Sequence, residues 1–168
     1  MTTLTFTTTD TPMGPFGWLT TDAGAVVASG WTTDPDYLRD LARSSATVVP
    51  GTDEPTSTAI ADFFAGDPAA LDRVPVQQQA GEFITDAWVA LRRVPAGERV
   101  TYTELAAAAG RPAAVRAAAS ACATNRAALF VPCHRVVRSD GGLGRFRYGV
   151  ETKQALLAFE ATMRPHGD

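Results

Sequence analysis

The stretch TYTELAAAAGRPAAVRAAASACATN, residues 101–125, decides how the second half of this chain folds. Its first part predicts a helix that Thr101 or Thr103 caps and Gly110 ends. Pro112 can open a second helix, because the first helical turn needs no N–H donor at that position. Two short helices joined by a Gly-Arg-Pro turn indicate a helix-turn-helix, which is typical of DNA-binding proteins but weak evidence when taken alone.

The N-terminal part has a β pattern followed by a short helix. Residues 18–31 predict a β-hairpin, because two apolar runs flank the turn signal Asp-Ala-Gly. Residues 48–58 contain two Pro and a Gly and predict a loop. Residues 57–67 predict a helix that Ser57 or Thr58 caps.

The C-terminal part is helical at both of its ends. Residues 81–98 predict a helix that a Pro and a Gly stop, and residues 151–163 predict a final amphipathic helix. We therefore expect an α/β domain with a small sheet over residues 1–80 and a mainly α domain over residues 81–168.

The composition indicates a folded protein outside the membrane. The 168 residues are 45% hydrophobic, and no apolar run approaches the roughly 20 residues that span a bilayer. The first ten residues lack the basic start and apolar core of a secretory signal, so we expect a cytoplasmic protein. In that reducing compartment, a buried inert thiol is the default interpretation of both Cys122 and Cys133.

Charge is distributed unevenly along the chain. Residues 1–80 carry three Arg against ten acids, a net charge of −7. Residues 81–160 carry ten Arg and one Lys against seven acids, a net charge of +4. A basic half favours a polyanionic partner for that half, although a solvated arginine face explains the charge equally well.

The sequence VPCHRVV, residues 131–137, holds Cys133 beside His134. A free thiol has a pKa of about 8.5, so a reactive cysteine needs a base or a positive field. His134 is the candidate base, since His166 lies in a polar tail. Adjacent side chains diverge, so direct contact between thiol and imidazole is not expected, and a bridging water could relay the proton. The helix that ends at Glu160 could supply a third, orienting group.

A metal site is not indicated by the cysteines and this histidine. Cys122, Cys133 and His134 lack a fourth ligand and have no usual ligand spacing. Residues 1–80 contain neither Cys nor His. We therefore expect no metal and no cofactor.

The motif around Cys133 resembles the signature of the O6-alkylguanine-DNA alkyltransferases, also called methylated-DNA–protein-cysteine methyltransferases. The resemblance rests on Pro-Cys-His-Arg, on an Asn eight residues and a Tyr thirty-one residues before the Cys, on the glycine-rich residues 138–149 and on KQALLAFE at residues 153–160. A looser likeness extends through the N-terminal half. The resemblance implies a ribonuclease-H-like domain over residues 1–80 and a winged helix-turn-helix-like DNA-binding and active-site domain over residues 81–168.

The resemblance also implies the activity. Cys133 accepts an alkyl group, such as methyl, from O6-alkylguanine in double-stranded DNA, irreversibly and once per molecule. The damaged base is first flipped out from the minor groove. We expect a monomer, with cooperative assembly on DNA, the adduct range and activity on O4-alkylthymine left open.

Individual roles follow from the same resemblance. His134 takes the thiol proton, Glu160 holds the imidazole, Asn125 braces the active-site turn and Tyr102 hydrogen-bonds guanine N3. The implied DNA contacts are Tyr102, Arg116 as the finger that replaces the flipped base, Ala117, Ser120 and Arg135. The implied pocket residues are Val136, Phe146, Arg147 and Tyr148.

Two positions depart from the pattern of many relatives. Arg147 stands where some branches have a small residue, so we expect small adducts such as methyl to be favoured over benzyl. Ala119 stands near a common Gly and alters the fit against DNA.

Other functions were weighed against this one. A non-catalytic alkylated-DNA-binding protein of the same fold has another residue, typically Trp, where Cys133 stands. A cysteine hydrolase predicts turnover without DNA. A plain helix-turn-helix regulator has no need of Pro-Cys-His-Arg.

Overall fold

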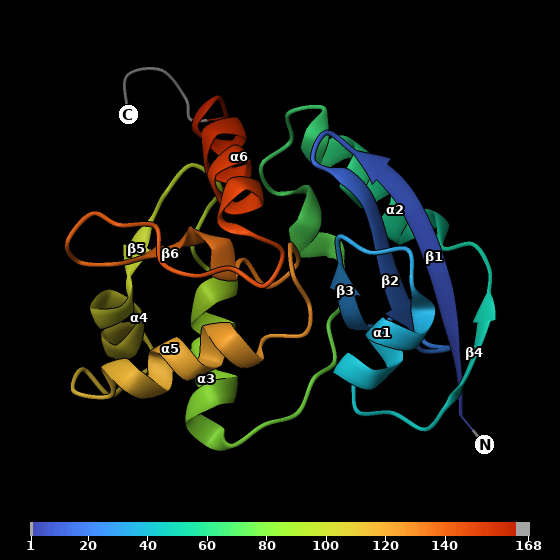
Figure 1. Cartoon of the computed structure of the whole chain (residues 1–168), viewed down its shortest axis with the longest axis horizontal. Coiled ribbons are helices and arrows are strands. Elements are labelled where there is room, and N and C mark those ends of the chain that lie inside the picture. The colour runs from blue at the N-terminus through green and yellow to red at the C-terminus, as the bar shows by residue number, and fades with distance from the viewer. Residues whose placement is uncertain (1, 164–168) are drawn as a thin grey trace. The chain divides into compact units, whose positions relative to one another are not determined.

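The computed structural model describes residues 2–163, so His166 lies outside the described residues. These residues form two compact units, one of residues 2–78 with 126–130 and the other of residues 79–125 with 131–163 (Figure 1). No sequence signal indicated that the short segment 126–130 packs with the first unit.

The first unit is built on a small mixed sheet. Its strands are β1 (Thr3–Thr11), β2 (Gly14–Thr20), β3 (Val26–Gly30) and β4 (Thr47–Pro50), in the order β3-β2-β1-β4. β2 pairs antiparallel with β1 and β3, whereas β4 runs parallel to β1. The predicted hairpin is thus present, but our predicted loop contains an edge strand. Its Pro50 is tolerated because it ends an edge strand, where a missing N–H breaks no central ladder.

Two helices cover this sheet (Figure 1). α1 (Pro35–Leu41) contributes Leu38 to a cluster with Leu19 of β2. Trp18, whose side chain points to the opposite face, donates its indole N–H to Asp53 at 2.9 Å. Asp53 also caps α2 (Glu54–Phe64), so the predicted caps Ser57 and Thr58 are wrong, and both lie inside the helix.

The segment 126–130 is held in the first unit by Ser29. The Ser29 N–H donates to the Arg126 carbonyl at 2.8 Å, and its hydroxyl donates to the Ala128 carbonyl at 2.8 Å. Phe130 packs edge-on against Phe16, with ring centroids 5.9 Å apart. These contacts fix the residues that lead into the Pro-Cys-His-Arg motif.

The second unit is mainly helical, as expected. It contains α3 (Glu82–Arg92), α4 (Tyr102–Ala108), α5 (Val115–Thr124) and α6 (Val150–Ala161). A two-residue parallel pair joins β5 (Val100–Thr101) to β6 (Val136–Val137), and a 3-10 helix covers Cys133–Arg135. Trp88 of α3 is buried and donates its indole N–H to the Ala121 carbonyl of α5 at 2.8 Å.

The helix pair α4 and α5 has defined ends. Thr101 and Glu104 form a capping box at the start of α4. Gly110, at φ +95°, ends it, because only a residue that tolerates the left-handed region closes this turn cheaply. Pro112 does not open the next helix as predicted: it lies in the turn, and α5 begins at Val115. Among the described residues, no helix combines the length and apolarity needed to cross a membrane.

Candidate active site

The β5–β6 pair brings two distant parts of the sequence together. Val100 pairs with Val136 and Thr101 pairs with Val137. Tyr102 follows β5 directly, and Cys133 precedes β6 by three residues. The pairing therefore places the start of α4 next to the cysteine turn.

Cys133 is held by the end of α5. Asn125 follows the last residue of α5, is buried, and donates its side-chain amide to the Val131 carbonyl at 2.8 Å and to Cys133 Sγ at 3.3 Å. The Cys133 N–H donates to the same Val131 carbonyl at 2.8 Å. The two bonds to Val131 close the turn, and the amide fixes the position of the sulfur.

The thiol of Cys133 is not a preformed thiolate. Burial raises the pKa of Cys133, although the hydrogen bond from Asn125 and the charges of Lys153 and Arg147 lower it. Because burial dominates, the sulfur needs a partner that takes its proton.

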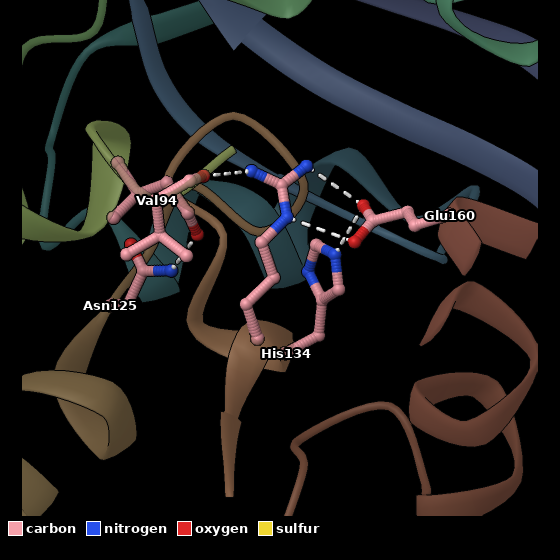
Figure 2. A network of polar contacts seen from close by, with 6 residues as sticks. Val94, Asn125, His134 and Glu160 are labelled. Carbon is pink, nitrogen blue, oxygen red and sulfur yellow. Dashed lines mark hydrogen bonds and ion pairs between the residues drawn. The ribbon is translucent and has the colours of Figure 1, made fainter. Parts of the chain in front are cut away.

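His134 has one ring nitrogen bound and one free (Figure 2). Its Nε2 lies 2.8 Å from Glu160 Oε2, and both side chains are buried. An ionised carboxylate only accepts hydrogen bonds, so Nε2 carries the hydrogen. Burial lowers the pKa of His134, against the opposing effect of Glu160, so the ring is neutral near pH 7. Nδ1 then has a lone pair, and it has no hydrogen-bond partner within residues 2–163.

Arg135 is part of this network and is buried. It is 6% exposed, donates Nε and Nη2 to the two oxygens of Glu160 at 2.9 and 2.8 Å, and donates Nη1 to the Val94 carbonyl at 2.7 Å. Burial raises the pKa of Glu160, but His134 and Arg135 outweigh it and lower that pKa to about 2. The predicted contact of Arg135 with DNA stays a prediction, and in this structure its guanidinium is buried and engaged in holding Glu160.

Lys153 is a site residue that we did not predict. It lies on α6, is fully buried, and donates Nζ to the Val136 carbonyl at 2.7 Å and to the Arg145 carbonyl at 3.5 Å. Burial lowers the pKa of Lys153, whereas both cysteines raise it. Its spacing of seven residues from Glu160 places both on one helix face, which was the available signal.

Tyr102 lies half-buried against the glycine-rich loop. A Cβ on Gly144 would lie 2.9 Å from the Tyr102 hydroxyl, so only glycine permits this approach. Burial raises the pKa of Tyr102, and the nearby Cys122 and Cys133 add to that effect. The phenol therefore stays protonated and can donate a hydrogen bond.

The other predicted pocket residues lie on or beside the same loop. Phe146 packs edge-on against His134 with centroids 6.4 Å apart, and Tyr148 packs against Phe146 at 5.9 Å. Val136 is fully buried, and its carbonyl accepts from Lys153. Arg147 is exposed and donates to a backbone carbonyl of α5.

The predicted DNA contacts on α5 lie on its outer part. Arg116, Ala119 and Ser120 are exposed, and Ala117 is half-buried. The buried side of the helix is formed by Ala118 and Ala121. Because most of the outward-facing side chains of α5 are small, another surface can approach the helix closely. Within residues 2–163, no group of three or more His, Cys, Asp or Glu side chains could hold a metal ion.

Comparison with known proteins places this geometry in a family. A family model described as the DNA-binding domain of 6-O-methylguanine DNA methyltransferase matches residues 82–162. The bifunctional transcriptional activator/DNA repair enzyme Ada of Escherichia coli is 51% identical over 88 residues, which are 52% of this chain and 25% of that protein. The chain thus spans about a quarter of the length of that relative.

Two further likenesses extend over nearly the whole chain. The methylated-DNA–protein-cysteine methyltransferase of Salmonella typhimurium is 34% identical over 160 residues, covering 89% of this chain and 91% of that protein. A crystal structure of Mycobacterium tuberculosis OGT in complex with DNA matches with a TM-score of 0.78 and 28% identity, covering 96% of each chain. The likeness supports the expected combination of a small mixed sheet with helices.

On this fold, the site combines a cysteine braced by an amide with a buried His–Glu pair. The chain belongs to the methylated-DNA–protein-cysteine methyltransferase family. The resemblance stated from the motif is confirmed, and so is the expected class, a methyltransferase of DNA repair, at the level of the family.

Proposed function

We propose that this protein removes an alkyl group from O6 of guanine in double-stranded DNA and keeps it on Cys133. The single observation that carries the proposal is the neutral, buried His134, whose Nδ1 lone pair is left unused next to the cysteine turn. A thiol whose pKa is raised by burial needs such a base.

The reaction is a single displacement. The Cys133 S–H proton passes through a bridging water to His134 Nδ1. The sulfur lone pair forms the new S–C bond while the C–O6 bond breaks, and its electron pair stays on the purine. Tyr102 donates its proton to N3, so guanine leaves neutral, and the imidazolium or solvent returns that proton. The product is a thioether, and no step restores the thiol.

Glu160 and Arg135 prepare the base for this step. The carboxylate fixes the hydrogen of His134 on Nε2 and stabilises the imidazolium that forms. Arg135 donates two hydrogen bonds to the carboxylate and keeps it ionised, so Glu160 does not compete for the proton. Lys153 adds a positive charge near the developing thiolate.

The damaged base has to leave the helix before it reaches the sulfur, because the O6 carbon is inaccessible to a thiolate inside stacked DNA. We infer that α5 enters the minor groove, whose width of about 6 Å suits an Ala-rich helix. Exposed Arg116 then fills the space that the flipped base leaves, with Ala117 and Ser120 at the same surface. A repair protein reads no flanking sequence, and this helix offers few side chains that read base edges.

The domain roles follow. We propose that the second unit, residues 79–125 with 131–163, is the DNA-binding and active-site domain, of winged helix-turn-helix type, and that the first unit, residues 2–78 with 126–130, is a ribonuclease-H-like domain. The protein acts as a monomer in the cytoplasm, without a cofactor.

The test is the fate of a labelled methyl group. Duplex DNA with radiolabelled O6-methylguanine is incubated with the full chain, and the label on protein is counted and mapped by mass spectrometry. We expect at most one equivalent, on Cys133. Release of label over repeated turnovers would support a hydrolase instead, and lesion binding without transfer would support the non-catalytic alternative.

A further inference from the structure

The segment 126–130 lies between the two residues that hold the reactive sulfur. Asn125 precedes it and Val131 follows it. The Asn125 amide donates to the Val131 carbonyl at 2.8 Å and to Cys133 Sγ at 3.3 Å. Residues 125–131 therefore form a closed loop, because a hydrogen bond joins the two ends. A change in the path of the five residues inside this loop moves the amide relative to the sulfur.

Leu129 gives this loop an uncommon backbone conformation. Its φ is +76°, in the left-handed region that residues with a side chain rarely adopt, and the residue is 1% exposed. Such a conformation costs free energy and persists only where the surrounding contacts impose it. The loop beside the thiol is therefore held in a strained form by contacts with residues outside the loop.

Ser29 of β3 supplies such a contact at the residue before Leu129. The Ala128 carbonyl accepts the Ser29 hydroxyl at 2.8 Å, and this carbonyl belongs to the peptide group that turns when φ of Leu129 changes. Ser29 is 0% exposed and Ala128 is 4% exposed. A rotated carbonyl would therefore lose its donor with no solvent to replace it, and that loss opposes relaxation of Leu129.

Two other hydrogen bonds anchor the start of the segment. The Ser29 N–H donates to the Arg126 carbonyl at 2.8 Å, and the Arg126 N–H donates to Gln78 Oε1 at 3.0 Å. Both act three residues before Leu129, whereas the Ser29 hydroxyl acts directly on the peptide group between Ala128 and Leu129. Neither of these two bonds uses the Ser29 side chain, so a substitution at this position isolates the effect of the hydroxyl.

We propose that Ser29 is a positioning residue for the alkyl acceptor. Its hydroxyl fixes the left-handed conformation of Leu129, and that conformation holds the Asn125 amide against Cys133 Sγ. The proposal rests on the proposed alkyl transfer to Cys133. Ser29 acts through the backbone of the segment and takes no part in the chemistry. Without the hydroxyl, Leu129 relaxes, the loop changes its path, and the amide no longer has a fixed distance to the sulfur.

The first test separates chemistry from DNA binding in the full chain. Single-turnover methyl transfer from duplex DNA with O6-methylguanine is measured against DNA concentration for the wild type and Ser29→Ala. We expect the maximal rate constant of the variant to fall about tenfold, because a misplaced sulfur slows the displacement. The DNA concentration that gives half of the maximal rate should stay unchanged, because the surface that binds DNA is intact. A maximal rate within about twofold of the wild type overturns the proposal.

The second test reads the sulfur directly and needs no alkylguanine. The rate at which iodoacetamide alkylates Cys133 is followed by mass spectrometry as a function of pH in both proteins. Burial raises the pKa of Cys133, and the hydrogen bond from Asn125 lowers it. Weakening that bond in Ser29→Ala should therefore move the midpoint of the profile to higher pH. An unchanged midpoint overturns the proposal.

Leu38→Ala controls for a general loss of stability in the first unit. Leu38 is fully buried in the cluster on one face of the sheet, whereas Ser29 pairs with Trp18 and lies on the other face. The Leu38 variant creates a cavity and should lose at least as much stability as Ser29→Ala, which urea unfolding measures. We expect Leu38→Ala to keep the wild-type maximal rate and midpoint, and equal changes in the two variants overturn the proposal.

The two tests also distinguish this proposal from the proposed function. Failure of the wild type to transfer methyl from duplex DNA to Cys133 would overturn the proposed function. The iodoacetamide midpoints do not depend on that transfer, so they would still decide whether Ser29 positions the sulfur.

Discussion

The two cysteines of this chain have similar surroundings and different neighbours. Cys122 and Cys133 are both half-buried in the second unit, and burial raises the pKa of both thiols. Lys153 lowers both pKa values. Yet Cys133 receives a hydrogen bond from Asn125 and stands next to His134, whereas the described residues give the Cys122 sulfur no hydrogen bond.

Solvent exposure and nearby positive charge therefore do not distinguish Cys133, the proposed alkyl acceptor, from Cys122. The difference lies in the backbone: Cys133 begins a 3-10 turn, and Cys122 is inside a regular helix. The turn points the sulfur toward the amide donor of Asn125, and His134 follows Cys133 directly in the same turn. The comparison teaches that reactivity here depends on the placement of a donor and a base.

The largest effect on methyl transfer is expected when each thiol is removed in turn. Cys133→Ala should abolish methyl transfer, a loss of at least about 1,000-fold, because no other group has both a donor and a base. Cys122→Ala should change the rate by about twofold or less. Single-turnover transfer from duplex DNA measures both. Label found on Cys122 would break the comparison.

Removing the base should have the next largest effect. His134→Gln should slow transfer roughly 100- to 1,000-fold, within the usual range for general-base catalysis. Since burial lowers the pKa of His134, the wild-type rate should hold at neutral pH and begin to fall only at a pH below the ordinary histidine value of about 6.5. Single-turnover rates between pH 5 and 9 check this.

In the Gln variant the acid limb should disappear, and the rate should rise with pH as hydroxide forms the thiolate directly. Alkylation of Cys122 by iodoacetamide should show a similar profile. Burial raises the pKa of the Cys122 thiol, so its reactive thiolate forms only at high pH. A wild-type acid limb that survives in His134→Gln would show that another group is the base.

Glu160→Gln tests the network behind the base. The variant leaves Arg135 buried without its carboxylate, so we expect a loss of about 3 kcal/mol in the free energy of unfolding at pH 7. The pKa of Glu160 is about 2 when folded, below the usual value of about 4.3. This stabilisation is therefore fully present above about pH 4.3 and disappears as the pH falls toward 2.

Urea unfolding at several pH values measures the difference between the two proteins. The gap should narrow below about pH 4, because the wild type then loses the charge that the variant lacks. Cys122→Ala is the control, and its stability should show no such pH dependence. A gap that is constant down to pH 3 would contradict the assigned ionisation of Glu160.

Gly144→Ala tests how closely the loop approaches Tyr102. The new Cβ would lie 2.9 Å from the Tyr102 hydroxyl, so the phenol or the loop has to move, and transfer should slow roughly tenfold. Gly141→Ala is the matched control, because Gly141 has φ +91°, similar to φ +79° at Gly144, but no atom within 4 Å of its added Cβ. Equal rates in the two variants would mean that backbone strain alone is responsible.

The smallest expected effect separates delivery of the base from chemistry at the sulfur. Arg116→Ala should slow transfer from duplex DNA about fivefold, roughly the loss of one hydrogen bond, and leave transfer from free O6-methylguanine unchanged. Arg99→Ala, which removes another exposed arginine of the second unit, is the control for net charge. An equal loss of transfer rate with duplex DNA and with the free base would show that Arg116 does not replace the flipped base.

The helices of the second unit could largely be predicted from sequence, because the residues that start and end each helix are local signals. Thr101 and Gly110 mark the ends of α4 through a capping box and a left-handed residue. Pro112 was misassigned since proline suits both a first helical turn and the turn before it. β4 was missed because its pairing with β1 comes from a distant segment, and no local pattern encodes it.

The site could be predicted only in part, because it too depends on contacts between residues distant in the sequence. The His134–Glu160 pair is a long-range contact, and the family motif supplied it, whereas the residues alone only allowed it. The DNA contact of Arg135 was implied by the family resemblance, and only the fold shows that this side chain is buried against Glu160. Lys153 was passed over because a buried lysine is rare.

The short segment 126–130 has a consequence for how this protein can be divided. Residues 126–130 connect Asn125 to Val131, the two residues that hold Cys133 in place. This segment contacts Ser29 and Phe16 of the first unit. A fragment that starts near residue 79 keeps every group of the reaction and loses the anchors of that segment. Such a fragment should keep the reacting side chains but hold the Cys133 sulfur less rigidly, because residues 126–130 would lose their contacts with Ser29 and Phe16.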